Sequence, residues 1–236
     1  MQMSQLKPAY ACAQQYGVKM LCYGGPGSGK TPIMRTAPNP VVIACEPGLL
    51  SLRDWDGPVW EAHNVPAIDD FFQWLNNSNE AKNFDTVCVD SASQMAEIYL
   101  AAELTTHKHG MKAYGEMSKS VMQHLGSSSS PMGRPTGLYY MQEKHVYLIA
   151  KQQLTDEGGG FFKKRPYFPG RELNIKVPHL YDEILHAGVT QIPGVVGEQR
   201  AFRTLESLDA TARDRSGRLD PFEPCDLAKL INKCMA

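Results

Sequence analysis

Short apolar runs separated by polar stretches are the most regular feature of this chain. Four of them are short enough to be strands and consist mainly of apolar residues; they cover residues 18–23, 41–45, 84–90 and 146–150. Runs of this kind are typical of strands that are buried on both faces of a sheet. We therefore expect four strands in the interior of the protein.

Longer stretches with apolar residues at helical spacing alternate with these runs. They predict helices over residues 67–77, 91–107, 117–125 and 224–233. A further helix of about two turns is expected from Thr31, because Pro32 and Pro38 limit its length. The alternation favours an α/β fold with a mainly parallel sheet and helices on both faces.

Two stretches interrupt this alternation. Residues 127–137 have the composition of a loop, and residues 154–170 hold three consecutive glycines followed by aromatic and basic residues. Long loops in a compact domain are usually functional or disordered. No repeat or clear linker divides the chain, so we expect an N-terminal arm or helix over residues 1–17 and one core over residues 18–236.

Composition places the chain among ordinary globular proteins, with 42% hydrophobic and 21% charged residues. The net charge of −1 gives no global basic surface for nucleic acid, so any such surface must be local. No apolar run reaches the ~18 residues that span a membrane, and residues 1–16 lack the apolar segment of a secretory signal. Six cysteines without a C-x-x-C pair favour reduced thiols in a cytoplasmic protein.

A glycine-rich segment follows the first predicted strand. Glycines let successive backbone N–H groups point at phosphate oxygens, and the positive end of the following helix faces the same anion. Lys30 would contact the β- and γ-phosphates, and the Thr31 hydroxyl would ligate Mg²⁺. The spacing predicts a P-loop that binds ATP and Mg²⁺ through Gly24, Gly25, Pro26, Gly27, Ser28, Gly29, Lys30 and Thr31.

The third predicted strand ends in an acid, Asp90, which Ser91 follows. A strand that ends in aspartate is a weak signal alone, because a turn residue often stands there. Next to a P-loop it predicts a Walker B aspartate that holds Mg²⁺ together with Thr31.

Hydrolysis also needs a group that orients or deprotonates the attacking water. Glu46 stands at the end of the second predicted strand and is expected at the same sheet edge as Lys30, although it could be a turn residue before Pro47. Gln152 follows the fourth strand and could sense the γ-phosphate, with Gln153 as the adjacent candidate. A solvated strand end is the alternative for both glutamines.

Residues 154–170 combine bases with aromatic side chains. Between residues 151 and 176 there are six Lys or Arg against three Asp or Glu. Lysine and arginine side chains attract the phosphate backbone, and aromatic rings stack on unpaired nucleobases. The pattern predicts DNA contacts by Phe161, Phe162, Lys163, Lys164, Arg165 and Tyr167.

Two alternatives qualify this DNA prediction. Residues 154–170 could form a β-hairpin whose aromatic side chains pack on the core while its lysines face water. The loop over residues 127–137, with Arg134, is a second candidate for DNA contact, or else a flexible surface loop.

Several short motifs occur together with the P-loop. They are Glu46-Pro47-Gly48 with Ser51-Leu52-Arg53, Asp90-Ser91, Tyr114-Gly115 before a helix, Pro169-Gly170-Arg171, and Arg213-Asp214-Arg215-Ser216-Gly217. In this order the set resembles the phage-encoded RecA-like ATPases of the Sak-type single-strand recombinase group. The similarity runs from about residue 18 to residue 231, although countless families share the P-loop.

The resemblance implies a RecA-like core that binds single-stranded DNA, assembles as a ring or filament with nucleotide near the subunit interface, and acts with a single-strand-binding protein in the cytoplasm of an infected bacterial host. It further implies that Arg213 and Arg215 reach the nucleotide of a neighbouring subunit. Arg213 stands where lysine is usual, and the two bases differ in geometry. A solvated charged turn is the alternative for both arginines.

Two rival functions stay open at this point. One is an ATPase that acts on a protein partner, such as a helicase loader or a packaging accessory, without direct DNA binding. The other is a small-molecule P-loop kinase, which is disfavoured because no arginine-rich lid is evident and because Glu46 suits water activation. The first expectation is an ATP-dependent single-stranded-DNA-binding recombinase or annealing protein that hydrolyses ATP.

Overall fold

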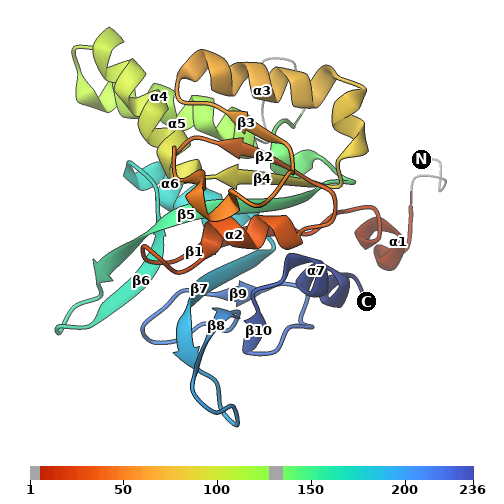
Figure 1. Cartoon of the computed structure of the whole chain (residues 1–236). Helices are drawn as coiled ribbons and strands as arrows, with labels where there is room; N and C mark the ends of the chain where they lie inside the picture. The colour runs from red at the N-terminus through yellow and green to blue at the C-terminus, as the bar shows by residue number, and fades with distance from the viewer. Residues whose placement is uncertain (1–5, 128–134) are drawn as a thin grey trace.

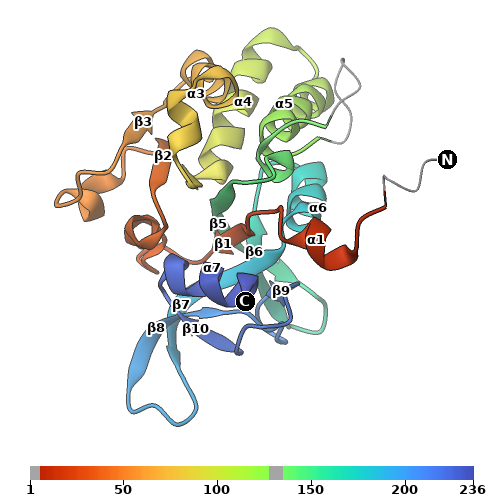
Figure 2. The ribbon, with the colours of Figure 1, turned by 90° about the vertical axis from the view of Figure 1, so that its right-hand side faces the viewer.

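The computed structural model describes residues 6–127 and 135–236, in which a sheet of ten strands is covered by helices on both faces (Figures 1 and 2). The strands are β1 (Lys19–Tyr23), β2 (Pro40–Ala44), β3 (Val59–Glu61), β4 (Thr86–Asp90), β5 (His145–Asp156), β6 (Phe162–Tyr167), β7 (Glu183–Gln191), β8 (Glu198–Arg203), β9 (Arg213–Asp214) and β10 (Phe222–Pro224). The helices are α1 (Ala9–Ala13), α2 (Lys30–Ile33), α3 (Val65–Asn77), α4 (Ala92–Thr106), α5 (Gly110–Leu125), α6 (Arg171–Leu180) and α7 (Leu227–Met235). Short 3₁₀ turns are η2 (Met34–Thr36), η3 (Leu49–Leu52), η4 (Glu80–Asn83) and η5 (Leu138–Tyr140).

The strands follow the order β10-β8-β7-β1-β5-β4-β2-β3, with β6 paired to β5 and β9 paired to β7. Every neighbouring pair from β7 to β3 is parallel, whereas β6, β8 and β9 run antiparallel to their partners. The carboxyl ends of β1, β2, β4, β5 and β7 therefore meet at one side of the sheet, which we call the carboxyl edge. The opposite side, where these strands begin, is the amino edge.

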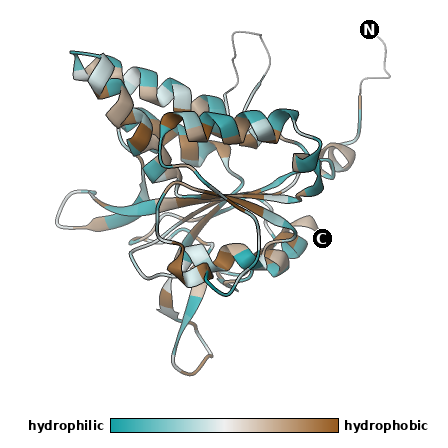
Figure 3. Ribbon diagram, turned by 45° about the horizontal axis from the view of Figure 1, so that its top comes forward, coloured by the Kyte–Doolittle hydropathy of each residue, from teal (hydrophilic) through white to brown (hydrophobic). Residues whose placement is uncertain are grey.

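Alternate residues of the central strands pack into two different cores. On β1, Leu21 and Tyr23 pack in one core with α3, α4, α5 and α6, whereas Met20 and Cys22 pack in the other with α2 and α7. Figure 3 shows these strands as the most hydrophobic part of the interior. Because each strand is covered on both faces, its sequence is a continuous apolar run rather than an alternating one.

The four strands and four helices expected from the apolar pattern are all present, with shifted ends. The helix predicted over residues 117–125 begins earlier, at Gly110, so Tyr114 and Gly115 lie inside it rather than before it. The strand predicted over residues 146–150 continues to Asp156. The two-turn helix that follows the P-loop consists of α2 and η2.

The expectation of a long loop over residues 154–170 is wrong. This stretch completes β5, turns at Gly158–Gly160 and returns as β6, so it forms a hairpin that projects from the body (Figure 1). The pattern also missed β3, α6 and β7 to β10. These elements are half-exposed or short, so their apolar residues do not form long runs, and pairing with the central sheet stabilises them instead.

Near its beginning the chain forms α1, a short helix with no buried residue that lies apart from the sheet (Figure 2). The division into an arm over residues 1–17 and a core over residues 18–236 stays a prediction. Within residues 6–127 and 135–236, no helix has the length and apolar character that a membrane crossing needs.

Candidate nucleotide site

The P-loop connects β1 to α2 at the carboxyl edge, and its shape depends on glycine. Gly27 and Gly29 have φ angles of 74° and 87°, in the left-handed region that favours glycine. A Cβ on Gly24 would lie 2.3 Å from the carbonyl oxygen of Ala187 on β7, so no larger residue fits there without movement. These positions let the loop curl tightly against the sheet and leave its backbone accessible.

Lys30 begins α2 and folds back over the loop. Its Nζ donates to the carbonyl oxygens of Gly24 and Gly25 at 2.8 and 3.0 Å and to Ser28 Oγ at 3.1 Å. Burial lowers the pKa of this ammonium group, and the neighbouring Asp90 and Glu46 partly oppose that shift. A cation held above a curled, glycine-rich backbone suits an anionic phosphate chain.

Asp90 and Thr31 meet beside this lysine. Thr31 Oγ1 donates to Asp90 Oδ2 at 2.7 Å, although the two residues lie 59 positions apart. Burial raises the pKa of Asp90 to about 6; the Thr31 hydrogen bond and Lys30 oppose the shift, and nearby Glu46 adds to it. A hydroxyl and a carboxylate are ligands of the kind Mg²⁺ prefers, so the pair fits the expected metal.

Glu46 follows β2 and reaches the same place. Ser91 Oγ donates to Glu46 Oε1 and also accepts from Gln94 N at 3.2 Å, which caps α4. The Cys45 N–H donates to the Asp90 carbonyl oxygen at 2.7 Å and so ties the ends of β2 and β4 together. One Glu46 oxygen is thus oriented by Ser91, a partner that the sequence did not single out.

The two adjacent glutamines on β5 have different partners. Gln152 Oε1 accepts from His186 Nε2 at 3.1 Å, at the carboxyl edge beside β1. Gln153 Nε2 instead donates to Pro166 O at 3.0 Å and Asn174 Oδ1 at 2.9 Å, between the hairpin and α6. Of the pair, Gln152 is therefore the one whose side chain faces β7 at the carboxyl edge, and its role as a γ-phosphate sensor stays a prediction.

No spacing or motif in the sequence marks His186 as a site residue. Burial lowers its pKa to about 4, with Lys164 and Arg203 adding to the effect, so the ring is neutral at pH 7. Its Nε2 carries the hydrogen, because the Gln152 oxygen only accepts. This hydrogen bond joins β5 and β7 across β1.

Arg200 on β8 is another residue that the sequence did not reveal. Its Nη2 lies 3.4 Å from the Gly27 carbonyl oxygen, and a Cβ on Gly29 would lie 3.4 Å from its Nη1. No spacing motif marks this arginine, because it comes from a strand that the apolar pattern did not predict. It brings a second cation to the P-loop.

Arg213 and Arg215 lie at the amino edge, because β9 pairs with the first residues of β7. Arg213 Nη2 donates to the carbonyl oxygens of Pro178, at 2.7 Å, and Tyr181. Arg215 pairs with Asp182 at 2.7 Å and donates to carbonyls at the end of α6. Both arginines thus bind the carbonyl end of α6 and lie away from the P-loop of the same chain; contact with a neighbouring subunit stays a prediction.

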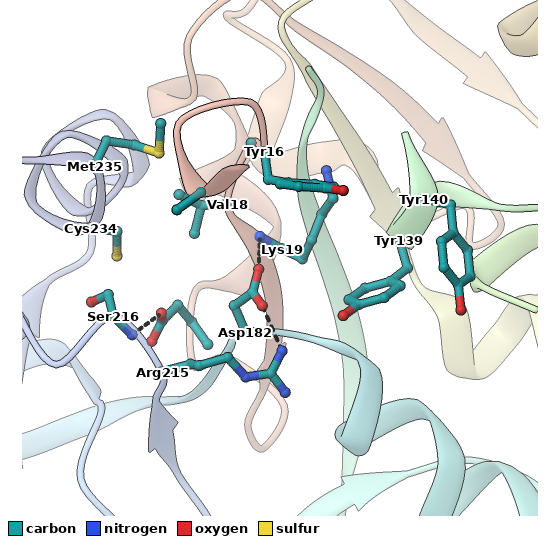
Figure 4. A pocket seen from close by; sticks show the side chains of 13 residues that line it. Tyr16, Val18, Lys19, Tyr139, Tyr140, Asp182, Arg215, Ser216, Cys234 and Met235 are labelled. Carbon is teal, nitrogen blue, oxygen red and sulfur yellow. Dashed lines mark hydrogen bonds and ion pairs between the residues drawn. The ribbon is translucent and has the colours of Figure 1, made fainter. Parts of the chain in front are cut away.

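A cavity of about 460 Å³ lies at this amino edge, with Arg215, Asp182 and Lys19 in its wall (Figure 4). Lys19 is only 2% exposed, and its Nζ donates to the carbonyl oxygens of Met141, at 2.7 Å, and Lys144. Burial lowers the pKa of Lys19 to about 8. Lys19, Arg213 and Arg215 therefore all donate hydrogen bonds to backbone carbonyl oxygens at this edge.

The predicted DNA residues lie on the β5–β6 hairpin. Phe161 and Phe162, at its tip, are 73% and 57% exposed, so these rings do not pack on the core. Tyr167 is half-buried at the end of β6. Arg134 lies outside the described residues.

The lysine and arginine side chains of the hairpin are less available for DNA than the sequence suggests. Lys163 pairs with Glu206, Lys164 with Asp209 at 3.1 Å, and Arg165 with Glu157 at 2.9 Å. Two of these acids come from residues after β8, which explains why a local charge count overestimates the positive charge of the hairpin.

Comparisons with known proteins give a family match and structurally similar proteins. The family model described as an AAA domain matches residues 16–216. A KaiC-like protein from the hyperthermophilic archaeon Pyrococcus horikoshii OT3 is 14% identical over 79% of this chain and 77% of that one, with a TM-score of 0.40. An ATPase from the type III secretion system of pathogenic bacteria is 11% identical over 75% of this chain and 53% of that one, with a TM-score of 0.42. The comparison with curated proteins gave no match.

The family match begins just before β1 and continues past β9, so it includes the P-loop, Asp90 and the whole parallel sheet. The fold is α/β with a mainly parallel sheet and helices on both faces, as the alternation of strands and helices predicted, and the family match makes it a P-loop NTPase fold. On the strength of that coverage, the chain belongs to the AAA-domain family and is a P-loop ATPase.

Proposed function

We propose that this ATPase binds single-stranded DNA under the control of ATP, as a recombinase or annealing protein of the Sak-type group that assembles as a ring or filament. One observation supports this most: β5 runs without interruption from the sheet beside the P-loop, through Gln152, to a projecting hairpin with two exposed phenylalanines. Strand β5 therefore offers a physical connection between the nucleotide and a surface on which bases can stack.

Each residue of the carboxyl edge has a distinct part in this proposal. Lys30 would bind the phosphate chain, and Thr31 with Asp90 would hold Mg²⁺. Glu46, oriented by Ser91, would align the attacking water and take its proton. Bound Mg²⁺–ATP would supply the phosphoryl group that is transferred to this water.

In this proposal Gln152 would report the state of the nucleotide to the hairpin. Its hydrogen bond to His186 fixes one side of the amide, and the next residues of β5 lead directly to the tip. A small change at Gln152 would therefore change the position of Phe161 and Phe162. Release of the phosphate product would then reset the hairpin to its weaker DNA-binding state.

The test is binding of a fluorescent poly-dT oligonucleotide at several salt concentrations, with and without ATP–Mg²⁺. Wild type is compared with Phe161→Ala/Phe162→Ala and with Lys163→Ala/Lys164→Ala/Arg165→Ala. We expect salt-sensitive binding that ATP strengthens, and a loss of about ten-fold or more in the phenylalanine variant, since each stacked base contributes about 1–3 kcal/mol.

Absence of binding in every nucleotide state would refute the DNA proposal and leave the ATPase intact. The search would then turn to a protein partner, for which the exposed Phe161 and Phe162 are also suited.

A further inference from the structure

A second cavity, of about 540 Å³, lies between the β5–β6 hairpin, α6 and residues 211–213. Figure 2 shows α6, β6 and β9 on the same side of the molecule. We call it the arginine cavity. Its volume is in the range of ligand sites, and among the described residues no aspartate or glutamate lines it. The polar part of its wall comes from Gln153, Thr155, Arg165, Arg171, Asn174, His179, Thr211 and Arg213.

Arg171 differs from the other lysine and arginine residues in this region because no carboxylate of the described residues pairs with it. Of the six Lys and Arg residues between residues 151 and 176, five pair with a carboxylate; these are Lys151, Lys163, Lys164, Arg165 and Lys176. Arg171 is exposed, and its side chain makes no hydrogen bond or ion pair with any residue that the structure describes. Its guanidinium group is therefore available to an external anion.

The wall of the arginine cavity also holds polar atoms without partners. Among the described residues, Thr155 Oγ1, Arg165 Nε and Arg213 Nε are buried side-chain atoms that make no hydrogen bond. More than about 90% of buried polar groups in folded proteins have a partner. Each of these three atoms has almost no accessible surface, so a ligand in the cavity would reach them only after a side-chain shift.

The chemistry of the wall selects the class of ligand. In the described part of the chain, three guanidinium groups and no carboxylate line the wall, which favours an anion. Glu157 already pairs with Arg165, and the Pro178 and Tyr181 carbonyls engage Arg213, so Arg171 is the group left for direct contact. Its planar guanidinium matches a phosphate group with two parallel hydrogen bonds. Pro166, Ile175 and Pro178 add an apolar part to the same wall, which suits a sugar or a base. The exposed Phe161 and Phe162 lie at the tip of the hairpin that forms one side of this cavity.

We propose that the arginine cavity binds backbone phosphates of single-stranded DNA, with Arg171 as the direct contact. This inference rests on the proposed function and adds its phosphate site. Lys163, Lys164 and Arg165 are secondary, because Glu206, Asp209 and Glu157 already engage them. The strand would then run from the arginine cavity along the hairpin toward the two phenylalanines.

The experiment compares full-length wild type with Arg171→Ala and with Arg218→Ala, using a fluorescent dT oligonucleotide over a range of salt concentrations in the presence of ATP–Mg²⁺. Arg218 is a matched control, since it is exposed, lies outside the arginine cavity and has no side-chain partner among the described residues. We expect Arg171→Ala to weaken binding about five-fold and to reduce the salt dependence by about 0.7, the contribution of one phosphate contact on a single strand. Arg218→Ala should bind like wild type.

Three results would overturn the site, each in a different way. Equal DNA binding by Arg171→Ala and Arg218→Ala would refute the arginine cavity while the proposed function stands. If Arg171→Ala instead weakened ATP binding, measured by titration with a fluorescent ATP analogue, the cavity would serve nucleotide phosphates. A wild-type protein that binds no oligonucleotide would refute the proposed function and this site together.

Discussion

The two edges of the central sheet hold buried charges for different purposes. At the carboxyl edge, Lys30 and Asp90 are arranged around the P-loop, and their partners are loop carbonyls and a hydroxyl. At the amino edge, Lys19, Arg213 and Arg215 bind carbonyl oxygens that end other elements. Both edges contain cations near carbonyls, so composition alone does not distinguish a binding site from a structural clamp.

The carboxyl edge differs from the amino edge in the accessible backbone of its P-loop. Its left-handed glycines leave N–H groups free to face a ligand. The carbonyls at the amino edge instead belong to a helix end and to loops, where they need a hydrogen-bond donor from within the protein. The carboxyl edge can therefore exchange its internal contacts for a ligand. The amino edge loses stability when its contacts are removed.

Replacement of Lys30 is the largest expected effect at the carboxyl edge. Lys30→Ala should lower the rate of ATP hydrolysis by about 1,000-fold, because a cation that stabilises the transferred phosphoryl charge is lost. Phosphate release at saturating ATP measures the rate. Thermal unfolding should change little, and a large fall in unfolding temperature would contradict the contrast between the edges.

Glu46→Gln tests the role of the carboxylate. We expect turnover to fall by about 100-fold with ATP affinity within about three-fold of wild type, since the amide keeps the shape and loses the base. Glu61→Gln is the matched control at the end of the neighbouring strand β3. Unchanged turnover in Glu46→Gln would remove Glu46 from the chemical step.

Lys19→Met tests the amino edge. It should lower the free energy of unfolding by about 2–4 kcal/mol, because the Met141 and Lys144 carbonyls lose their donor. Urea unfolding measures this change, and ATP affinity of the folded variant should stay unchanged. An unaltered urea midpoint would show that Lys19 does not clamp this edge.

Glu183 makes the contribution of the amino edge to the free energy of unfolding depend on pH. It is 1% exposed, and burial, together with Asp214, raises its pKa from 4.5 to about 8. Between these values the unfolded chain has lost this proton and the folded chain retains it, so the contribution of Glu183 to stability falls as pH rises. Glu183→Gln should therefore gain roughly 1–3 kcal/mol relative to wild type between pH 5 and pH 8.

The measurement is urea unfolding of both proteins at several pH values. Below pH 4.5 the carboxyl group is protonated in both states, and above about 8 it is ionised in both, so the difference should level off at either end. A difference that does not change between pH 5 and pH 8 would contradict the raised pKa.

Arg200→Ala gives the smallest expected effect. Its guanidinium group approaches the P-loop at Gly27, so its loss should weaken ATP binding about three- to ten-fold, the size of one exposed charged contact. Titration with a fluorescent ATP analogue measures the affinity. Gln199→Ala, the next residue on β8, points to the other face and should leave the affinity unchanged.

The sequence alone determined the core of the sheet and the P-loop. Buried strands need apolar side chains on both faces, so residues 18–23 and 41–45 can be recognised in the sequence as apolar runs. The P-loop is equally local, because its glycines, Lys30 and Thr31 are fixed by backbone geometry within eight positions. Asp90 and Glu46 could be assigned to one edge from the sequence, because parallel strands end at a common edge.

Only the tertiary structure decided which charges are free. Lys163 and Lys164 look basic in sequence, but Glu206 and Asp209 reach them from beyond β8. Arg171 becomes notable only because it has no such partner among the described residues.

The same holds for Arg200, which comes to the P-loop 173 positions from Gly27 through a strand that lacks an apolar run. Contacts of this range depend on strand order and register. Local composition does not specify either one, because both follow from how the whole chain packs.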